Sequence, residues 1–315
     1  TDVQGRIISE GSWNGREAVV EGTIDIATLK IFDKYRLHHV RGPFRVENDR
    51  IIVGTVDAFR SGESSRPLDP AEQVTAEFIG GMLTLNSQAL LKDSGDYAIR
   101  LNVSQGDLER FAQLYMQSRE LLQGKVNGWV ALKGEASGTA SLAGTGQLQI
   151  SPARLYRAPV VFQVLNTLSM ASRDESAFAY ARVDFDVARE QFLFKKIDLV
   201  GSQFQLAGQG TANFDGKLDL TFVSMLPRST MARRPQVWIP IITELTGLAR
   251  GVTNLVGVVV EVSRTTELPQ TRVIPAKNLD DRVKSFMQTL TTLPLHPPAP
   301  PRLPPLANPF ILRPF

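Results

Sequence analysis

The sequence predicts a mainly β protein, built of antiparallel strands with a few short helices. Two observations lead to this prediction: apolar and polar residues alternate along many short segments, and turn residues separate these segments. Ile24 and Ile26 show the pattern early, since polar Thr23 and Asp25 alternate with them. A period of two with one apolar side is typical of antiparallel strands that have one buried face and one solvated face.

The turn signals divide the chain into strands of ordinary length. Turns between strands are predicted at Gly80-Gly81, Asp93-Ser94-Gly95 and Asp215-Gly216. The strand series is therefore expected to run from about residue 3 to about residue 225. Each apolar face must be covered, either by a second packed sheet or by the curling of one sheet around a ligand. Periodicity alone leaves both arrangements open.

Three or four helices are expected to interrupt or follow the strands. Ser104 is the expected cap of the first and Pro159 the expected opening residue of the second. The third and fourth are expected at Ile241–Leu248 and Leu279–Leu290. The apolar stripe of the first consists of Leu108, Phe111, Ala112, Tyr115 and Leu122, and that of the second of Val161, Leu165 and Leu168. The stripe of the fourth helix could face a membrane or partner, although packing on its own sheet is the favoured alternative.

The chain changes character after Leu293. Nine prolines lie between Pro294 and Pro314, so the segment 294–315 is expected to be extended or disordered, with docking of a partner in polyproline form as the alternative. No comparable linker occurs earlier, and residues 1–293 are expected to form one domain. Arg60–Pro70 reads as a long polar loop.

Composition argues against several classes of function. The chain has no cysteine, which removes disulfides, cysteine–zinc sites and thiol catalysis. It has three histidines and no Gly-x-Ser-x-Gly motif, which leaves little room for a nucleophilic triad. The net charge is only +3, and Arg233-Arg234 is too small a cluster for nucleic acid. Gly144-Thr145-Gly146 and Gly208-Gln209-Gly210 do not continue into nucleotide-binding loops, and are expected to be turn or bulge glycines.

Two clusters of polar residues are weighed as sites and set aside. His38 and His39 are adjacent, and adjacent strand residues lie on opposite faces, so they cannot easily bind one metal ion. Asp184 and Asp186 share a face and could do acid–base chemistry, but they form the polar side of an amphipathic strand. We therefore expect no catalytic residues, metal site or cofactor.

The apolar runs are too short to span a membrane. Val237–Ala249 is broken by Glu244, and Val252–Val260 falls well short of about 18 residues. The chain begins with Thr1 and has no recognisable signal peptide. We expect an excerpt of a longer polypeptide, or a mature chain whose anchor lies upstream.

The order of glycine-spaced strands resembles the C-terminal region of AsmA-like proteins, which are related to TamB-type envelope proteins. The segments that carry the resemblance are Leu142–Ile150, Arg154–Val160, Phe192–Phe194, Ile197–Gly201, Leu206–Gly210 and Phe214–Leu220. Gly80–Leu85, Tyr97–Leu101 and Asp107-Leu108 are similar to the hairpin-then-helix units of the family, and Leu226–Pro269 to its closing section. The resemblance covers about four fifths of the chain, and the proline-rich segment lies outside it.

The resemblance implies a periplasmic protein of the Gram-negative envelope, anchored in the inner membrane by a segment not present here. It implies a curled antiparallel sheet forming a repeating β-groove, which carries phospholipid between the inner and outer membranes and so supports outer-membrane biogenesis. It brings no catalytic residues. The candidate lining of the groove is Ile99, Leu101, Val103, Leu148, Ile150, Val183, Phe185, Val187, Leu199, Leu206, Leu218, Leu220 and Phe222.

The energy of lipid transfer makes such a groove useful. Burial of one methylene is worth about 0.8 kcal/mol, so a chain of roughly 16 carbons loses about 13 kcal/mol on entering water. An apolar trough offsets most of this cost while the head group stays in water. The alternative is a structural or assembly factor of the envelope that acts through protein contacts, with a filled core and an apolar patch at one end. An enzyme acting on glycans is a third hypothesis, supported only by scattered carboxylates.

Overall fold

The structure is a computed structural model, which describes residues 4–13, 18–31, 34–56, 69–91, 95–116, 122–168, 178–201, 205–227 and 255–274. The expected helices Ile241–Leu248 and Leu279–Leu290 and the segment 294–315 lie outside the described residues, as does most of the polar loop Arg60–Pro70.

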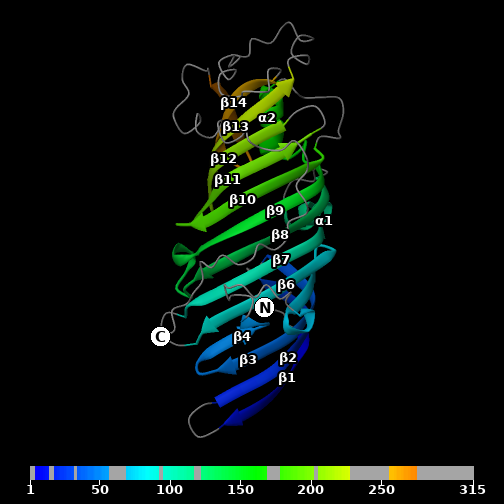
Figure 1. Cartoon of the computed structure of the whole chain (residues 1–315), viewed down its shortest axis with the longest axis vertical. Coiled ribbons are helices and arrows are strands. Elements are labelled where there is room, and N and C mark those ends of the chain that lie inside the picture. The colour runs from blue at the N-terminus through cyan, green and yellow to red at the C-terminus, as the bar shows by residue number, and fades with distance from the viewer. Residues whose placement is uncertain are drawn as a thin grey trace.

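The described strands form one antiparallel sheet of 15 strands, which confirms the mainly β fold (Figure 1). Its order is β1-β2-β3-β4-β6-β7-β8-β9-β10-β11-β12-β13-β14-β15, while β5 pairs with both β3 and β6. The strands are β1 Gln4–Trp13, β2 Ala18–Ile31, β3 Tyr35–Glu47, β4 Arg50–Val53, β5 Val74–Phe78, β6 Gly81–Leu90, β7 Tyr97–Asp107, β8 Gln123–Gly134, β9 Ala143–Arg154, β10 Tyr180–Ala188, β11 Gln191–Val200, β12 Gln205–Asn213, β13 Lys217–Pro227, β14 Leu255–Thr265 and β15 Pro269–Ile274. Short 3-10 turns occur at Pro70–Glu72 and Thr139–Ser141.

The cross-strand pairing gives the sheet one continuous apolar face. Leu101 of β7 is opposite Val130 of β8, which is opposite Gly146 of β9. The row continues through Phe185 of β10 to Phe194 of β11. Because directly opposite residues lie on the same face, the alternating pattern of each strand is carried in register to the next. The sheet curls with this face inward, and we call it the inner face.

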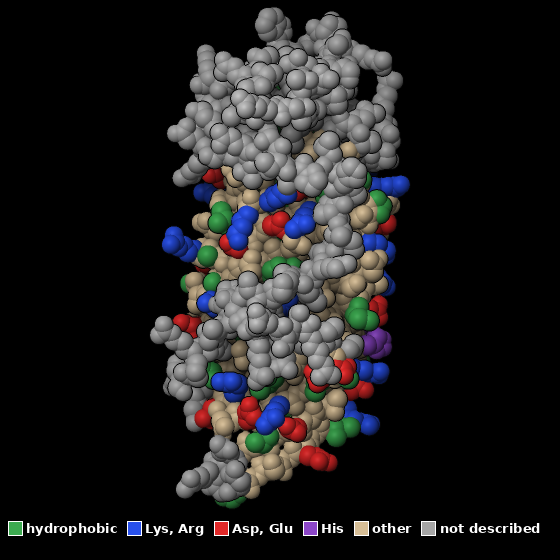
Figure 2. All heavy atoms as spheres, in the orientation of Figure 1, with side chains coloured by type: hydrophobic (Ala, Val, Ile, Leu, Met, Phe, Trp, Pro, Cys, Tyr) green, Lys and Arg blue, Asp and Glu red, His purple; other side chains and the backbone are tan. Residues whose placement is uncertain are grey.

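The opposite face of the sheet, the outer face, is charged. Figure 2 shows acidic and basic side chains spread over the strands turned toward the viewer. Lys195 lies 2.7 Å from Asp186, and Lys196 lies 2.7 Å from Asp198. The Lys195–Asp186 pair is largely exposed, and such a pair stabilises a fold by less than about 1 kcal/mol. Asp198 is buried, and Lys196 supplies the positive charge that its carboxylate needs there.

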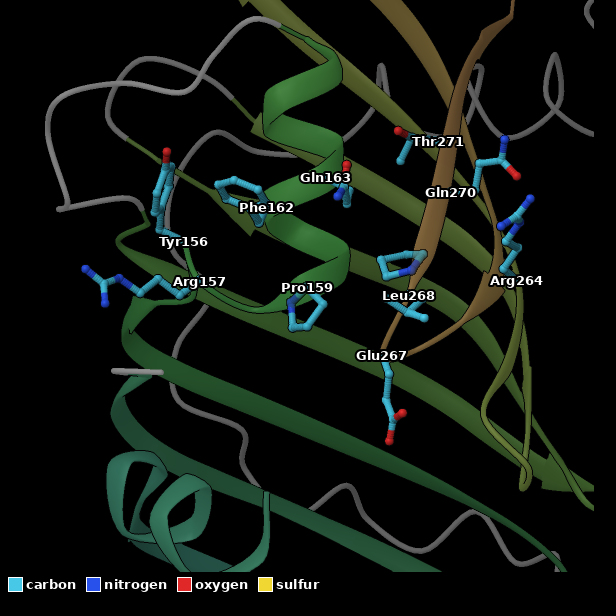
Figure 3. Close-up of a pocket in the computed structure, with 11 residues that line it drawn as sticks. Tyr156, Arg157, Pro159, Phe162, Gln163, Arg264, Glu267, Leu268, Gln270 and Thr271 are labelled. Atoms are coloured by element: carbon cyan, nitrogen blue, oxygen red, sulfur yellow. The ribbon is translucent and has the colours of Figure 1, made fainter. Parts of the chain in front are cut away.

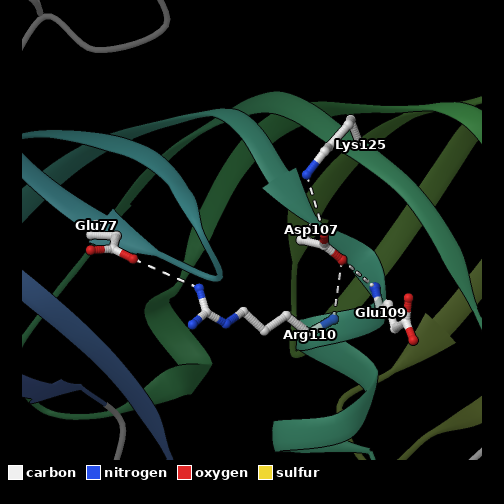
Figure 4. Close-up of polar contacts among 5 residues, drawn as sticks. All are labelled: Glu77, Asp107, Glu109, Arg110 and Lys125. Carbon is white, nitrogen blue, oxygen red and sulfur yellow. Dashed lines mark hydrogen bonds and ion pairs between the residues drawn. The ribbon is translucent and has the colours of Figure 1, made fainter.

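Helix α1, Leu108–Tyr115, begins later than the sequence indicates. The expected cap, Ser104, lies in β7 opposite Met82. Asp107 caps the helix instead, and its carboxylate accepts hydrogen bonds from the backbone N–H groups of Glu109 at 3.0 Å and of Arg110 at 3.2 Å (Figure 4). Ser104 was therefore the wrong prediction, because pairing with β6 and β8 holds the chain extended up to Asp107.

Two ion pairs attach the start of α1 to the sheet. Lys125 of β8 lies 3.1 Å from the Asp107 carboxylate, and Arg110 reaches Glu77 of β5 at 3.7 Å (Figure 4). The aromatic rings of Phe111 and Tyr115 then pack on Tyr35 of β3, with the Tyr115 and Tyr35 centroids 5.1 Å apart. Helix α1 is thus fastened across one edge of the sheet. The expected stripe residue Leu122 is buried in the core but lies beyond the helix.

Helix α2, Pro159–Thr167, begins at the proline that the sequence indicates. Pro159 needs no hydrogen bond for its nitrogen in the first turn, and its fixed φ suits a helix start. Val161 and Leu165 are buried, as is Leu168 directly after the helix. This stripe packs on the inner face of the sheet.

The strand series continues beyond the expected limit near residue 225, because β14 and β15 complete the sheet. Val258, Val259 and Val260 of β14 are all fully buried. A strand that is covered on both faces has no reason to alternate, and this explains why the run lacks the period-two signal.

Candidate functional site

All thirteen candidate lining residues lie on the inner face. One row of directly opposite residues runs from Ile99 through Leu132 and Gly144 to Val187. A second row runs from Val103 through Gly128 and Leu148 to Val183. The other candidates fall into the same rows. The pairings that place them are Phe185–Phe194, Leu199–Leu206, Ala212–Leu218, Gly210–Leu220, Gly208–Phe222 and Val126–Ile150.

Accessibility divides these residues into two groups. Ile99, Leu101 and Val103 on β7 are half-buried, and Leu148 on β9 is 39% exposed. The pairing adds Val130 and Leu132 of β8, which are also half-buried. We call these six residues, Ile99, Leu101, Val103, Val130, Leu132 and Leu148, the open apolar strip. The structure adds the two β8 residues to the candidates; the alternation of β8 was obscured by the apolar residues Trp129 and Ala131 on its outer face.

The second group is covered by the protein itself. Leu206 has no exposed surface, and Leu220 and Phe222 are 4% and 3% exposed. They belong to one core with Val164 and Leu165 of α2. Five candidates share this core, and they are Leu199, Leu206, Leu218, Leu220 and Phe222. Ile150 and Val183 pack against it half-buried, and Phe185 and Val187 are buried outside it at 7% and 3% exposure. The inner face is therefore filled beneath α2 and accessible along the open apolar strip.

Glycines opposite large side chains shape the inner face. Gly146 pairs with Phe185, Gly208 with Phe222, and Gly134 with Tyr97. A Cβ atom on Gly208 would lie 2.6 Å from the Phe222 ring, and one on Gly134 would lie 2.8 Å from the Tyr97 hydroxyl. Small residues opposite large ones let the concave side of a curled sheet close without overpacking. The glycines of the Gly144–Gly146 and Gly208–Gly210 motifs thus lie within strands rather than turns.

A pocket of about 880 Å³ lies between α2 and the β14–β15 hairpin (Figure 3). Pro159 and Phe162 form the wall on α2, and Leu268 and Pro269 form the wall on the hairpin. Phe162 is 39% exposed and Leu268 is 76% exposed. The volume is in the range that binds small ligands, and solvent-exposed apolar side chains on both walls suit a hydrocarbon group.

Polar groups surround the apolar walls of this pocket. Gln163 and Thr271 contribute polar side chains, and Arg157, Arg264 and Glu267 contribute charged ones. Figure 3 shows Arg157 and Arg264 on opposite sides of α2. The lining therefore carries one more positive than negative charge.

Arg264 has an unusual position in the sheet. It is opposite Leu218 of β13, and this pairing puts it on the inner face. Among the described strand residues that pairing assigns to the inner face, Arg264 is the one charged residue. Its φ is +73°, in the left-handed region that residues other than glycine rarely adopt. It forms no ion pair within the described part of the chain.

The other polar candidates take ordinary structural places. His38 and His39 are exposed, and His38 Nδ1 lies 3.3 Å from Thr28 Oγ1. Asp184 on the outer face accepts a hydrogen bond from Gln147 at 2.5 Å and lies 3.3 Å from Arg182. Within the residues that the structure describes, no group of three acidic or histidine side chains is placed to hold a metal ion.

Neither described helix is long and apolar enough to cross a membrane. Comparison of the chain with protein-family models, curated proteins and solved structures gives no match. The functional argument therefore depends on the geometry of the inner face and of the pocket.

Proposed function

We propose that the chain is a non-enzymatic conduit for phospholipid, which carries acyl chains along the inner face of its curled sheet. The observation that supports the proposal is the continuous apolar inner face, accessible along the open apolar strip. An acyl chain lying there exchanges contact with water for contact with Leu101, Leu148 and their neighbours. Each methylene so covered recovers about 0.8 kcal/mol, and the head group can remain in water.

The outer face supports the same proposal by contrast. It carries paired charges, such as Lys195 with Asp186, where the inner face is mainly apolar and has one charged residue, Arg264, among the described strand residues. A sheet with both faces in water would be expected to carry polar residues on both of them. The Gram-negative periplasm, between an inner-membrane anchor and the outer membrane, is the setting we propose, with support of outer-membrane biogenesis as the role.

A photo-crosslinking experiment tests the proposal. A photoreactive amino acid replaces Leu148, which is 39% exposed on the inner face, or Leu193, which is 47% exposed on the outer face. The two sites are matched in residue type and exposure. We expect phospholipid to be captured at Leu148 and not at Leu193, and native mass spectrometry of the purified chain to show bound phospholipid. Absence of lipid in both measurements, or equal capture at both sites, contradicts the proposal.

A structural or assembly factor is the second candidate, and two observations favour it. The inner face is filled by α2 over Leu206, Leu220 and Phe222. Apolar residues are also exposed on the edge strand β1, where Ile7 and Trp13 are 64% and 75% exposed on the inner face and Ile8 is 60% exposed on the outer face. This candidate predicts that the photoreactive residue at position 148 captures protein rather than lipid, so the same experiment separates the two functions.

A further inference from the structure

We propose that the pocket between α2 and the β14–β15 hairpin binds the negatively charged, phosphate-type head group of an amphiphile, with Arg264 as the residue that recognises it. The inference rests on the proposed function, because it names the kind of lipid that the inner face would carry. It also identifies a binding position, at the place where α2 fills the inner face.

The first step of the argument is the isolation of Arg264. The paired residues of the inner face are otherwise apolar or uncharged, and Arg264 has no ion-pair partner within the described residues. An arginine has five N–H donors in a planar fork that fits phosphate and carboxylate oxygens. A cation without an ion-pair partner among the described residues, at the rim of an apolar surface, is the arrangement expected for a ligand with an apolar tail and an anionic head.

The second step is the shape of the pocket. Phe162 and Leu268 face solvent from opposite walls and provide contact for the first methylenes of a tail. Gln163 can supply a hydrogen bond from the pocket wall, while the Thr271 hydroxyl lies 2.6 Å from the Thr167 hydroxyl and is already paired. Glu267 also lines the pocket, and in Figure 3 its side chain extends away from Arg264. A cationic head group would therefore meet Arg264 across the apolar walls and be disfavoured.

Titration calorimetry of the 315-residue chain tests the inference, with ligands that share a 12-carbon tail and are kept below micelle formation. The probes are dodecyl phosphate, dodecyltrimethylammonium and inorganic phosphate. We expect dodecyl phosphate to bind most tightly, and Arg264→Gln to weaken it by about tenfold, the loss of one charge-assisted hydrogen bond. Leu268→Ser should also weaken it. Arg272→Gln is the matched control, because Arg272 lies on the same hairpin but pairs with Glu261 on the outer face.

The outcomes separate this inference from the proposed function. Equal binding of the anionic and cationic probes, or an unchanged affinity in Arg264→Gln, overturns the head-group site while lipid capture at Leu148 keeps the conduit. Binding of inorganic phosphate as tight as that of dodecyl phosphate shows a simple anion site and also overturns the inference. Thermal unfolding of each variant, at the same midpoint as the unaltered chain, shows that a loss of binding is not a loss of fold.

Discussion

The ring of Phe185 lies against Gly146, in the space that a β-carbon of residue 146 would occupy. The two residues are directly opposite each other on β9 and β10. Glycine is an unfavourable residue for a strand on propensity grounds, so its place here depends on the size of its partner. The relationship fixes how closely the inner face can curl.

Replacement of Gly146 by valine is expected to destabilise the fold. Valine has the higher strand propensity and would stabilise an open strand, but its side chain overlaps the Phe185 ring. Overpacking of this kind costs about 1–3 kcal/mol in the free energy of unfolding. Urea denaturation followed by circular dichroism measures the change. The double variant with Phe185→Ala should recover part of the loss, and a stabilised single variant would contradict the packing argument.

Helix α2 is expected to hold the C-terminal part of the sheet together through its buried stripe. Leu165 is 1% exposed, and its replacement by alanine should lower the free energy of unfolding by about 2–5 kcal/mol. The neighbouring Asn166 is exposed, so Asn166→Ala is a matched control with little expected effect. Equal denaturation midpoints for the two variants would show that α2 does not contribute to the core.

The cap of α1 predicts a dependence on pH. The backbone N–H of Arg110, followed by Lys125, lowers the pKa of Asp107 below its usual value. A lowered pKa means that the folded state favours the charged carboxylate, so this stabilisation is complete above the usual carboxyl pKa near 4 and is lost as pH falls through the lowered value. Asp107→Ala should cost about 1 kcal/mol at neutral pH.

The acid dependence is the test that distinguishes a cap from a simple packing role. In the alanine variant, the part of the acid destabilisation due to Asp107 should be absent, as measured by urea denaturation between neutral and acidic pH. Asp107→Asn retains an oxygen that can cap the helix but loses the charge facing Lys125. It should keep most of the neutral-pH stability, and an equal loss in both variants would argue against the cap.

The hydroxyl of Tyr115 is expected to contribute through one hydrogen bond. It accepts from the backbone N–H of Arg36 at 3.1 Å, while its ring packs on Tyr35. Tyr115→Phe keeps the ring and should lower the free energy of unfolding by about 0.5–1.5 kcal/mol. Tyr156→Phe serves as the control, since its ring packs on Phe162 and its hydroxyl makes no hydrogen bond to any residue that the structure describes. Hydrogen exchange of the Arg36 amide gives a local measure of the same loss.

Much of the sheet could be predicted from the sequence because strand periodicity is a local property. The alternation within each segment predicts that Leu101, Leu148 and Phe185 lie on the apolar face, and the cross-strand pairing places them together. The same alternation predicts that Asp184 and Asp186 lie on the opposite, polar face, where the pairing puts them. Periodicity does not predict what covers the inner face, because α2 packs on residues of β12, β13 and β14 that are distant in the sequence.

The differences from expectation have nonlocal causes. Ser104 and Asp107 are both good caps, and the choice between them depends on the pairing of Gly106 with Val126. The run around Val259 lost its alternation because it is buried on both faces. The inner position of Arg264 depends on its register with Leu218, which no local pattern reports. The role of the thirteen lining residues in contacting lipid stays a prediction.

The sheet order has a consequence for how the molecule unfolds. Apart from β5, each strand pairs only with strands adjacent in the order of the sheet, and that order follows the chain. Such an assembly resembles a linear array, in which stability is a sum of units and of the interfaces between them. Hairpins at one end can fray while the remainder stays intact, and formation can spread like a zipper from any well-packed hairpin. The same architecture allows a trough to be lengthened or shortened by whole hairpins without redesign of its centre.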